Sequence, residues 1–272
     1  MTGLWQAEQR DVRPVLTRER ADLLVLLEQL TDREWLAPTA VAGWRVKDLA
    51  LHLLDDDLGW LSRGRDDDAS GLLDSSQSSF VVALAAKNQR WIDGAQGLSR
   101  RVVTDLLTWS GGEMDRYYAD MDLSDRGSVA WASDEPVPLW FDVAQDLTER
   151  WVHQQQIRVA LDRDDGYRDR YLPEVLRTFV WAAPHQYRER AEAGVEVTLR
   201  LGGAGEWTLV SEGEGRWTLH ERIATSPSAV VTATDDGAWR MFTGAALADG
   251  DVPAEGDPRL TESLARVRGI LV

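Results

Sequence analysis

The chain has 272 residues, of which 43% are hydrophobic and 28% are charged, a composition typical of a globular protein. It contains no apolar run of about 20 residues, the length that a membrane-spanning helix needs. Its first residues lack the basic start and apolar stretch of a signal peptide. Because the sequence holds no cysteine, disulfides, thiolate metal ligands, iron–sulfur clusters and a protein thiol nucleophile are excluded.

The net charge is −16, from 46 acidic side chains against 30 basic ones. Such a field repels phosphate backbones, and no basic patch stands out, so we expect no nucleic-acid partner. With no apolar run long enough to span a bilayer, we expect no membrane partner either. Acidic runs such as residues 55–57 and 66–68 are typical of solvated helix ends and loops. These properties predict an acidic cytoplasmic protein, either a monomer or a homodimer.

Helical periodicity dominates the first part of the chain. Apolar residues recur at helical spacing in five segments, at residues 5–30, 46–63, 78–95, 99–118 and 139–161. The stretch 121–138 has no clear period and contains a glycine and two prolines, which indicates a long connection. Long helices with one long connection predict an antiparallel helical bundle.

Beyond a loop at 162–167 the pattern changes. A further helix is predicted at 173–192, and two short ones follow near 236–242 and 258–270. Alternation with period two predicts strands at 195–201, 207–210, 217–220 and 230–233. The fold class is therefore α+β with two domains: a helical bundle at 1–165 and a small, mostly antiparallel α+β domain at 166–272.

Two of the four histidines suggest a metal site. His153 follows Glu149 by four residues, so the two side chains lie on one helix face about one turn apart. His52 lies midway along the 46–63 segment, roughly 130° from the centre of its aliphatic stripe. Two histidines and one carboxylate from two helices of a bundle form a three-ligand site with open coordination positions, the usual form of a catalytic zinc site.

The same spacing has a second interpretation. A Glu/His pair four residues apart is common on solvated helix faces, where it contributes a few tenths of a kcal/mol. The other residues of the Glu149 face are polar, namely Asp142, Asp146 and Gln156, whereas the opposite face is apolar. Periodicity alone therefore predicts that the face with Glu149 and His153 is exposed to solvent.

Two segments carry a resemblance to a known family. Residues 44–52, Trp-Arg-Val-Lys-Asp-Leu-Ala-Leu-His, resemble the first signature of the mycothiol-dependent maleylpyruvate isomerase family, within the DinB-like bundle superfamily. Residues 148–158, Thr-Glu-Arg-Trp-Val-His-Gln-Gln-Gln-Ile-Arg, are similar to its second signature. Both occur in the expected order and spacing. The resemblance implies that His52, Glu149 and His153 are the metal ligands.

The resemblance covers nearly the whole chain. It implies a DinB-like metal-binding bundle at 1–165 and a sterol-carrier-like domain at 166–272, whose last helix follows Gly-Asp-Pro-Arg-Leu at 256–260. It also implies a divalent metal and mycothiol or a similar thiol as cosubstrate, and the His/His/Glu donor set favours Zn²⁺ as that metal. The signatures are specific for the fold and the metal, and weak for the substrate.

The chain departs from the family pattern in two respects. Many relatives have an aspartate three residues after the ligand histidine, where this chain has Gln156. The carboxylate that would orient the ligand is therefore missing or supplied elsewhere. Active family members also use an arginine of the C-terminal domain, for which Arg240 is our candidate catalytic residue and Arg222 the other choice.

Three functions stay open at this point. In the first, a bound metal activates a small external thiol, which attacks a small electrophilic substrate in an isomerase or S-transferase reaction. The absence of cysteine agrees with an external thiol. In the second, the bundle holds metal without thiol chemistry, either as a hydrolase-like enzyme or without catalysis. In the third, the chain is a small-molecule-binding module whose C-terminal domain holds an apolar ligand.

Overall fold

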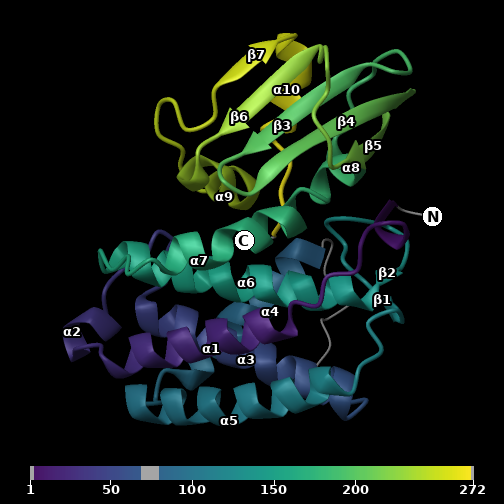
Figure 1. Ribbon diagram of the computed structural model, residues 1–272. Helices are drawn as coiled ribbons and strands as arrows, with labels where there is room; N and C mark the ends of the chain where they lie inside the picture. Colours follow the sequence, from purple (N-terminus) through teal and green to yellow (C-terminus); the bar gives the residue numbers. More distant parts are fainter. Residues whose placement is uncertain (1–2, 69–79, 271–272) are drawn as a thin grey trace. The chain divides into compact units, whose positions relative to one another are not determined.

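A computed structural model describes residues 3–68 and 80–270 of the chain, which divide into two compact units (Figure 1). The helical unit consists of Val12–Asp122 and Arg150–Asp165, and the sheet unit of Met1–Asp11, Leu123–Glu149 and Gly166–Val272. The units share one boundary with the predicted domains, at residue 165. The assignment of 1–165 and 166–272 as the two domains stays a prediction.

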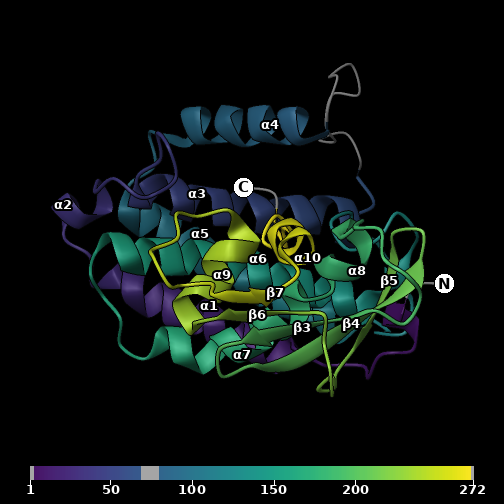
Figure 2. The same cartoon turned by 90° about the horizontal axis from the view of Figure 1, so that it is seen from above.

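The helical unit is built mainly from long helices, with one short helix, α2 (Asp32–Trp35), among them. The helices are α1 (Arg13–Glu28), α2, α3 (Val46–Trp60), α4 (Phe80–Ala95), α5 (Arg100–Ala119) and the second half of α6 (Leu139–Ala160), with a π-helical turn at Leu61–Arg65. α3 packs against α4 and α5, and α5 also packs against α1, as Figures 1 and 2 show. The predicted helical N-terminal region is confirmed.

The core of the helical unit follows the aliphatic stripes of the sequence. Leu27 of α1, Leu49 and Leu53 of α3, and Leu107 of α5 belong to one buried cluster. Each buried leucine contributes roughly 1.5–3 kcal/mol of hydrophobic free energy. α3 is the central helix of this core, because most of its side chains are buried on every face.

Two helix boundaries differ from the prediction for local reasons. The first long helix begins at Arg13 rather than near residue 5, with a proline in its first turn, where the missing N–H has no helical partner to lose. A separate short helix, α2, follows because Thr31 and Glu34 form a capping box. The Thr31 N–H donates to the Glu34 carboxylate at 2.8 Å, and the Glu34 N–H donates to the Thr31 hydroxyl at 3.3 Å.

The sheet unit combines a five-stranded sheet with short helices. Its strands are β3 (Glu196–Leu201), β4 (Gly205–Gly213), β5 (Arg216–His220), β6 (Ala229–Ala233) and β7 (Ala254–Gly256), in the order β5-β4-β3-β6-β7. Only the β3–β6 pair is parallel. α9 (Asp235–Thr243) and α10 (Pro258–Leu264) pack against β6. The predicted α+β class is confirmed.

Two other predictions for this unit differ from the structure: the helix at 173–192 and the connection at 121–138. α7 (Tyr167–Phe179) starts six residues before Pro173, because the buried side chains of Tyr167 and Tyr171 extend its apolar stripe toward the N-terminus. The chain then turns into α8 (Ala182–Gln186) instead of continuing to residue 192. Within the predicted connection, β1 (Arg126–Gly127) pairs with β2 (Val137–Pro138). No helix among the described residues is long and apolar enough to cross a membrane.

Candidate metal centre

α3 carries His52 into the interior of the helical unit. The helix starts after Arg45, whose backbone N–H donates to the Asp48 carboxylate at 2.8 Å and so satisfies a donor of the first turn. His52 follows one turn after Asp48, and only 4% of its surface is exposed. The ring of Trp44 meets the His52 ring edge-on, with centroids 5.3 Å apart. The imidazole is therefore held between the helix start and its neighbours.

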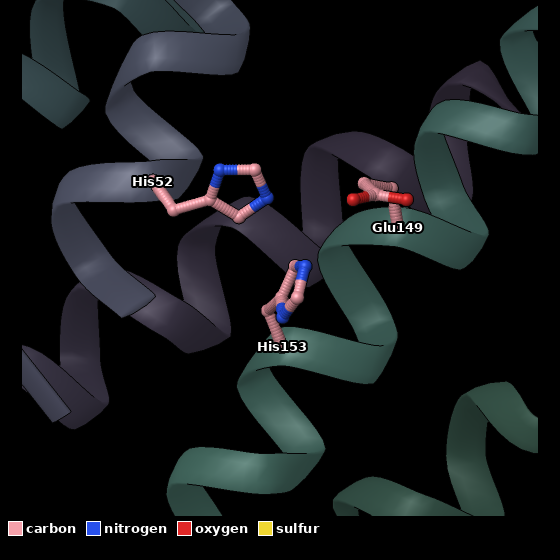
Figure 3. A group of neighbouring side chains, drawn as sticks. All are labelled: His52, Glu149 and His153. Carbon is pink, nitrogen blue, oxygen red and sulfur yellow. The ribbon is translucent and has the colours of Figure 1, made fainter. Parts of the chain in front are cut away.

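α6 supplies the other two side chains of the group. Glu149 and His153 lie one turn apart on the same face of this helix, and both point toward His52 (Figure 3). One potential ligand atom from each of the three residues lies within 4.8 Å of those of the other two. The two imidazole rings are nearly perpendicular, with centroids 4.6 Å apart. The structure thus brings together the three residues that the sequence selects.

Hydrogen bonding orients His153. Its Nδ1 lies 2.9 Å from the Oε1 of Gln156, one turn further along α6. In the tautomer that carries its proton on Nδ1, His153 donates to this amide oxygen, and Nε2 is then the ring nitrogen with a lone pair. Metal-binding histidines commonly have such an arrangement, in which the second ring nitrogen donates to a neighbouring acceptor. Gln156, at the position where the resemblance implies an aspartate, therefore contacts the His153 ring itself.

The donor set fits a divalent cation. Two imidazole nitrogens and one carboxylate oxygen are ligands that Zn²⁺ accepts, and three protein ligands leave a position for another molecule. A further carboxylate lies close by, since the Oδ2 of Asp56 is 3.4 Å from the Nε2 of His52. The negative charges of Glu149 and Asp56 favour a cation between the two helices.

The exposed-face interpretation of α6 is wrong. His153 is 3% exposed and Gln156 is 6% exposed, while Asp142 and Asp146 are also buried. Burial raises the pKa of Asp142 to about 6; a backbone hydrogen bond from Ser128 lowers this pKa, and the charge of Asp146 raises it. A polar helix face predicts solvent exposure only if no other part of the protein packs against it. On α6 this polar face is buried instead.

The prediction that residues 55–57 form a solvated acidic run is also wrong. Asp57 is 1% exposed and Asp55 is 8% exposed, and each has a basic partner. Asp55 pairs with Lys87 of α4, and Asp57 with Arg150 of α6. Sequence reasoning missed these partners because the run gives no sign of which side chains lie opposite it.

The candidate arginines of the C-terminal region are both engaged locally. Arg240 lies on α9, where its Nε donates to Asp236 at 2.6 Å and its guanidinium stacks over the Trp239 ring at 4.8 Å. Arg222 follows β5 and pairs with Glu196 of β3. A catalytic role for Arg240 stays a prediction.

Comparison with known proteins identifies the family of this chain. Residues 16–158 match the model of the family described as the mycothiol maleylpyruvate isomerase N-terminal domain. The chain belongs to this family. The matched range covers more than half of the chain and includes His52, Glu149 and His153. The family suggested by the two sequence signatures is therefore confirmed.

Solved structures of an isomerase of this kind share the fold. A crystal structure of the mycothiol-dependent maleylpyruvate isomerase matches with a TM-score of 0.51 and 16% sequence identity, over 93% of this chain and 95% of that chain. A structure of a histidine-to-alanine mutant of that isomerase matches with the same values. No curated protein matches the sequence. At this identity the likeness extends to the fold and not to a particular substrate.

Proposed function

We propose that the protein is a metal-dependent enzyme that uses a low-molecular-weight thiol of the mycothiol type on a small electrophilic substrate, as an isomerase or an S-transferase. One observation carries the proposal: His52, Glu149 and His153 converge within 4.8 Å, in a chain of the mycothiol maleylpyruvate isomerase family. We further propose that these three residues are the ligands and that the cofactors are a divalent metal, Zn²⁺ by preference, and the thiol.

Each residue of the group has a distinct task in this proposal. His52 and His153 each offer a ring nitrogen as a ligand, and the contact between Gln156 Oε1 and Nδ1 orients the His153 ring so that Nε2 would be the ligand atom. Glu149 adds a negative charge that offsets part of the charge of a cation. When bound, a divalent cation favours the thiolate form of a thiol over the neutral form.

The chain itself provides no competing thiol, because it has no cysteine. The nucleophilic sulfur therefore comes from the cosubstrate. Its addition to one carbon of a cis double bond, rotation and elimination of the same thiol would give a trans product without a redox partner. In an S-transfer reaction the adduct would be released instead. The small external thiol is thus a reactant in the second reaction and a recycled cofactor in the first.

Metal content tests the ligand assignment. We expect wild-type protein loaded with Zn²⁺ to retain about one ion per chain after gel filtration, as one three-residue site predicts. His153→Ala should lose most of it, because two ligands hold the ion far more weakly. His220→Ala is the matched control, since His220 lies on β5 and approaches Thr218 at 3.2 Å, so it should retain the metal. Equal metal content in wild type and His153→Ala would refute the assignment.

Thiol dependence tests the reaction separately. The metal-loaded wild type should convert a cis-configured electrophile such as maleylpyruvate, or form an S-adduct, only when mycothiol is added. Mass spectrometry distinguishes an isomer of unchanged mass from an adduct. Turnover that continues in thiol-free buffer would contradict the thiol mechanism, and would indicate water activated by the metal as the nucleophile.

A further inference from the structure

A second group of charged side chains lies inside the helical unit, next to the candidate metal centre. It consists of Glu19 and Arg20 of α1, Asp57 of α3 and Arg150 of α6, which are 0%, 5%, 1% and 2% exposed. We call these four residues the buried ion cluster. Its two acids and two bases sum to zero charge, so the cluster leaves no net charge in the interior.

Arg150 is the member that joins the helices of the metal centre. Its Nη1 donates to the Asp57 Oδ1 at 2.9 Å, and its Nε donates to the Glu19 Oε2 at 3.3 Å. Asp57 also accepts from Arg20 Nη1 at 2.7 Å, and from the Ser110 hydroxyl of α5 at 2.7 Å. Four helices thus meet at one carboxylate and one guanidinium.

The cluster is adjacent to the candidate ligands along both α3 and α6. Arg150 directly follows Glu149 and precedes His153 by three residues, while Asp57 follows His52 by five. The Arg150–Asp57 ion pair and the His52–His153 ring contact therefore both join α6 to α3. They lie about one turn apart along each helix. Two contacts of this kind restrict both the shift of α6 along α3 and its rotation about its own axis.

We propose that Arg150 is a positioning residue of the metal centre: bonded to Asp57 and Glu19, it sets the register of α6 against α3 that brings Glu149 and His153 to His52. The inference rests on the proposed function, because it concerns metal binding at those three residues. Arg150 does not contact the metal in this proposal. It acts through the helix that carries two of the ligands.

The physical reason is the directionality of the bonds. Apolar contacts between helices tolerate small shifts, whereas a guanidinium fork bonded to two carboxylates holds one geometry. Buried ion pairs contribute little net stability, since desolvation offsets their attraction, and fixing one register is the role best attested for them. A metal site needs its ligands placed to a fraction of an ångström, so a small shift of α6 is expected to weaken binding strongly.

The test compares Arg150→Lys with Arg158→Lys in the full-length protein. Arg158 is on the same helix, is 4% exposed and pairs with Asp165, which lies after α6 rather than on α3. Both variants keep their charge and lose the planar fork. The measurements are the dissociation constants of Zn²⁺ and Co²⁺ by competition with a chelator, the visible spectrum of the Co²⁺ form, and unfolding of the metal-free protein in urea.

We expect Arg150→Lys to weaken Zn²⁺ binding at least tenfold and to alter the Co²⁺ spectrum, and Arg158→Lys to change neither beyond twofold. If Arg150→Lys does not fold, Ser110→Ala carries the test, because it removes only the hydroxyl that bonds Asp57 and should weaken binding by a smaller factor. A folded Arg150→Lys or Ser110→Ala with wild-type affinity and spectrum would overturn this inference alone. A wild-type protein that binds neither ion would overturn the proposed function and this inference with it.

Discussion

The group that contacts Nδ1 of His153 is the neutral amide of Gln156 and not a carboxylate. A carboxylate at the same place would draw the Nδ1 proton more strongly and make the imidazole a more basic ligand. The amide oxygen, 2.9 Å from Nδ1, carries no net charge and so exerts a weaker pull on such a proton. A metal held this way would keep more of its own positive charge for a bound thiol.

Asp142, two turns before Glu149 on the same helix, is a carboxyl group whose environment opposes ionisation. Burial raises its pKa to about 6 from an ordinary value of 3.8; the N–H of Ser128 lowers this pKa, and the charge of Asp146 raises it. Because the folded pKa exceeds the unfolded one, the folded protein binds the proton more tightly between these two values. This group therefore stabilises the fold below about pH 4, and that contribution is lost as the pH rises to about 6.

We predict that Asp142→Asn stabilises the protein at pH 7 and not at pH 4. The amide oxygen can still accept from the Ser128 N–H, which lies 3.0 Å from the carboxylate, and the cost of a buried charge disappears. The rise in the pKa of Asp142 corresponds to a gain of at most about 3 kcal/mol in the free energy of unfolding at pH 7. Urea unfolding at both pH values measures this gain. Asp134→Asn is the control, because the side chain of Asp134 is highly exposed. A gain of the same size at both pH values would contradict the argument.

The long helices and most strands are predictable because their signals are local. Leu49 and Leu53 lie on a helical stripe, and the residues of β3 alternate with period two. The short elements were missed: α2 depends on a capping box, and β7 has three exposed residues and pairs only along the edge of β6. The capping box of α2 is a local signal, but it spans only four residues and carries no apolar period. β7 instead depends on β6, which is distant in the sequence, so a local pattern does not reveal it.

Two helical glycines give opposite predictions for the same substitution. A Cβ at Gly237 of α9 would lie 2.3 Å from the backbone oxygen of Asp251, whereas a Cβ at Gly112 of α5 would meet nothing within 4 Å. Alanine in an open helical position stabilises by up to about 1 kcal/mol. We therefore expect Gly112→Ala to raise the melting temperature and Gly237→Ala to lower it. If both variants shift it in the same direction, the close approach of α9 to the Asp251 backbone is not a rigid constraint.

At the scale of the whole molecule, the sequence predicts the fold class and the metal group better than it predicts the polar interior. The resemblance of two segments selects His52, Glu149 and His153 as candidate ligands, and the structure brings these three side chains together. The partners of Arg150 leave no fixed spacing in the sequence, since Glu19 comes from α1 and Asp57 from α3. For the same reason the sequence predicts a solvated acidic run at 55–57, although Asp57 lies in the interior.

The net charge of −16 gives a final prediction about the whole chain. Like charges repel one another more strongly in the compact state than in the expanded unfolded chain, so an excess of acids destabilises the fold. Raising the ionic strength from about 0.01 M to 0.15 M shortens the Debye length from about 30 Å to 8 Å and screens this repulsion. The same salt weakens exposed ion pairs, but each of those contributes less than about 1 kcal/mol. We therefore expect sodium chloride to raise the melting temperature of the metal-free protein over this range. A fall would mean that the exposed ion pairs outweigh the repulsion between the excess acids.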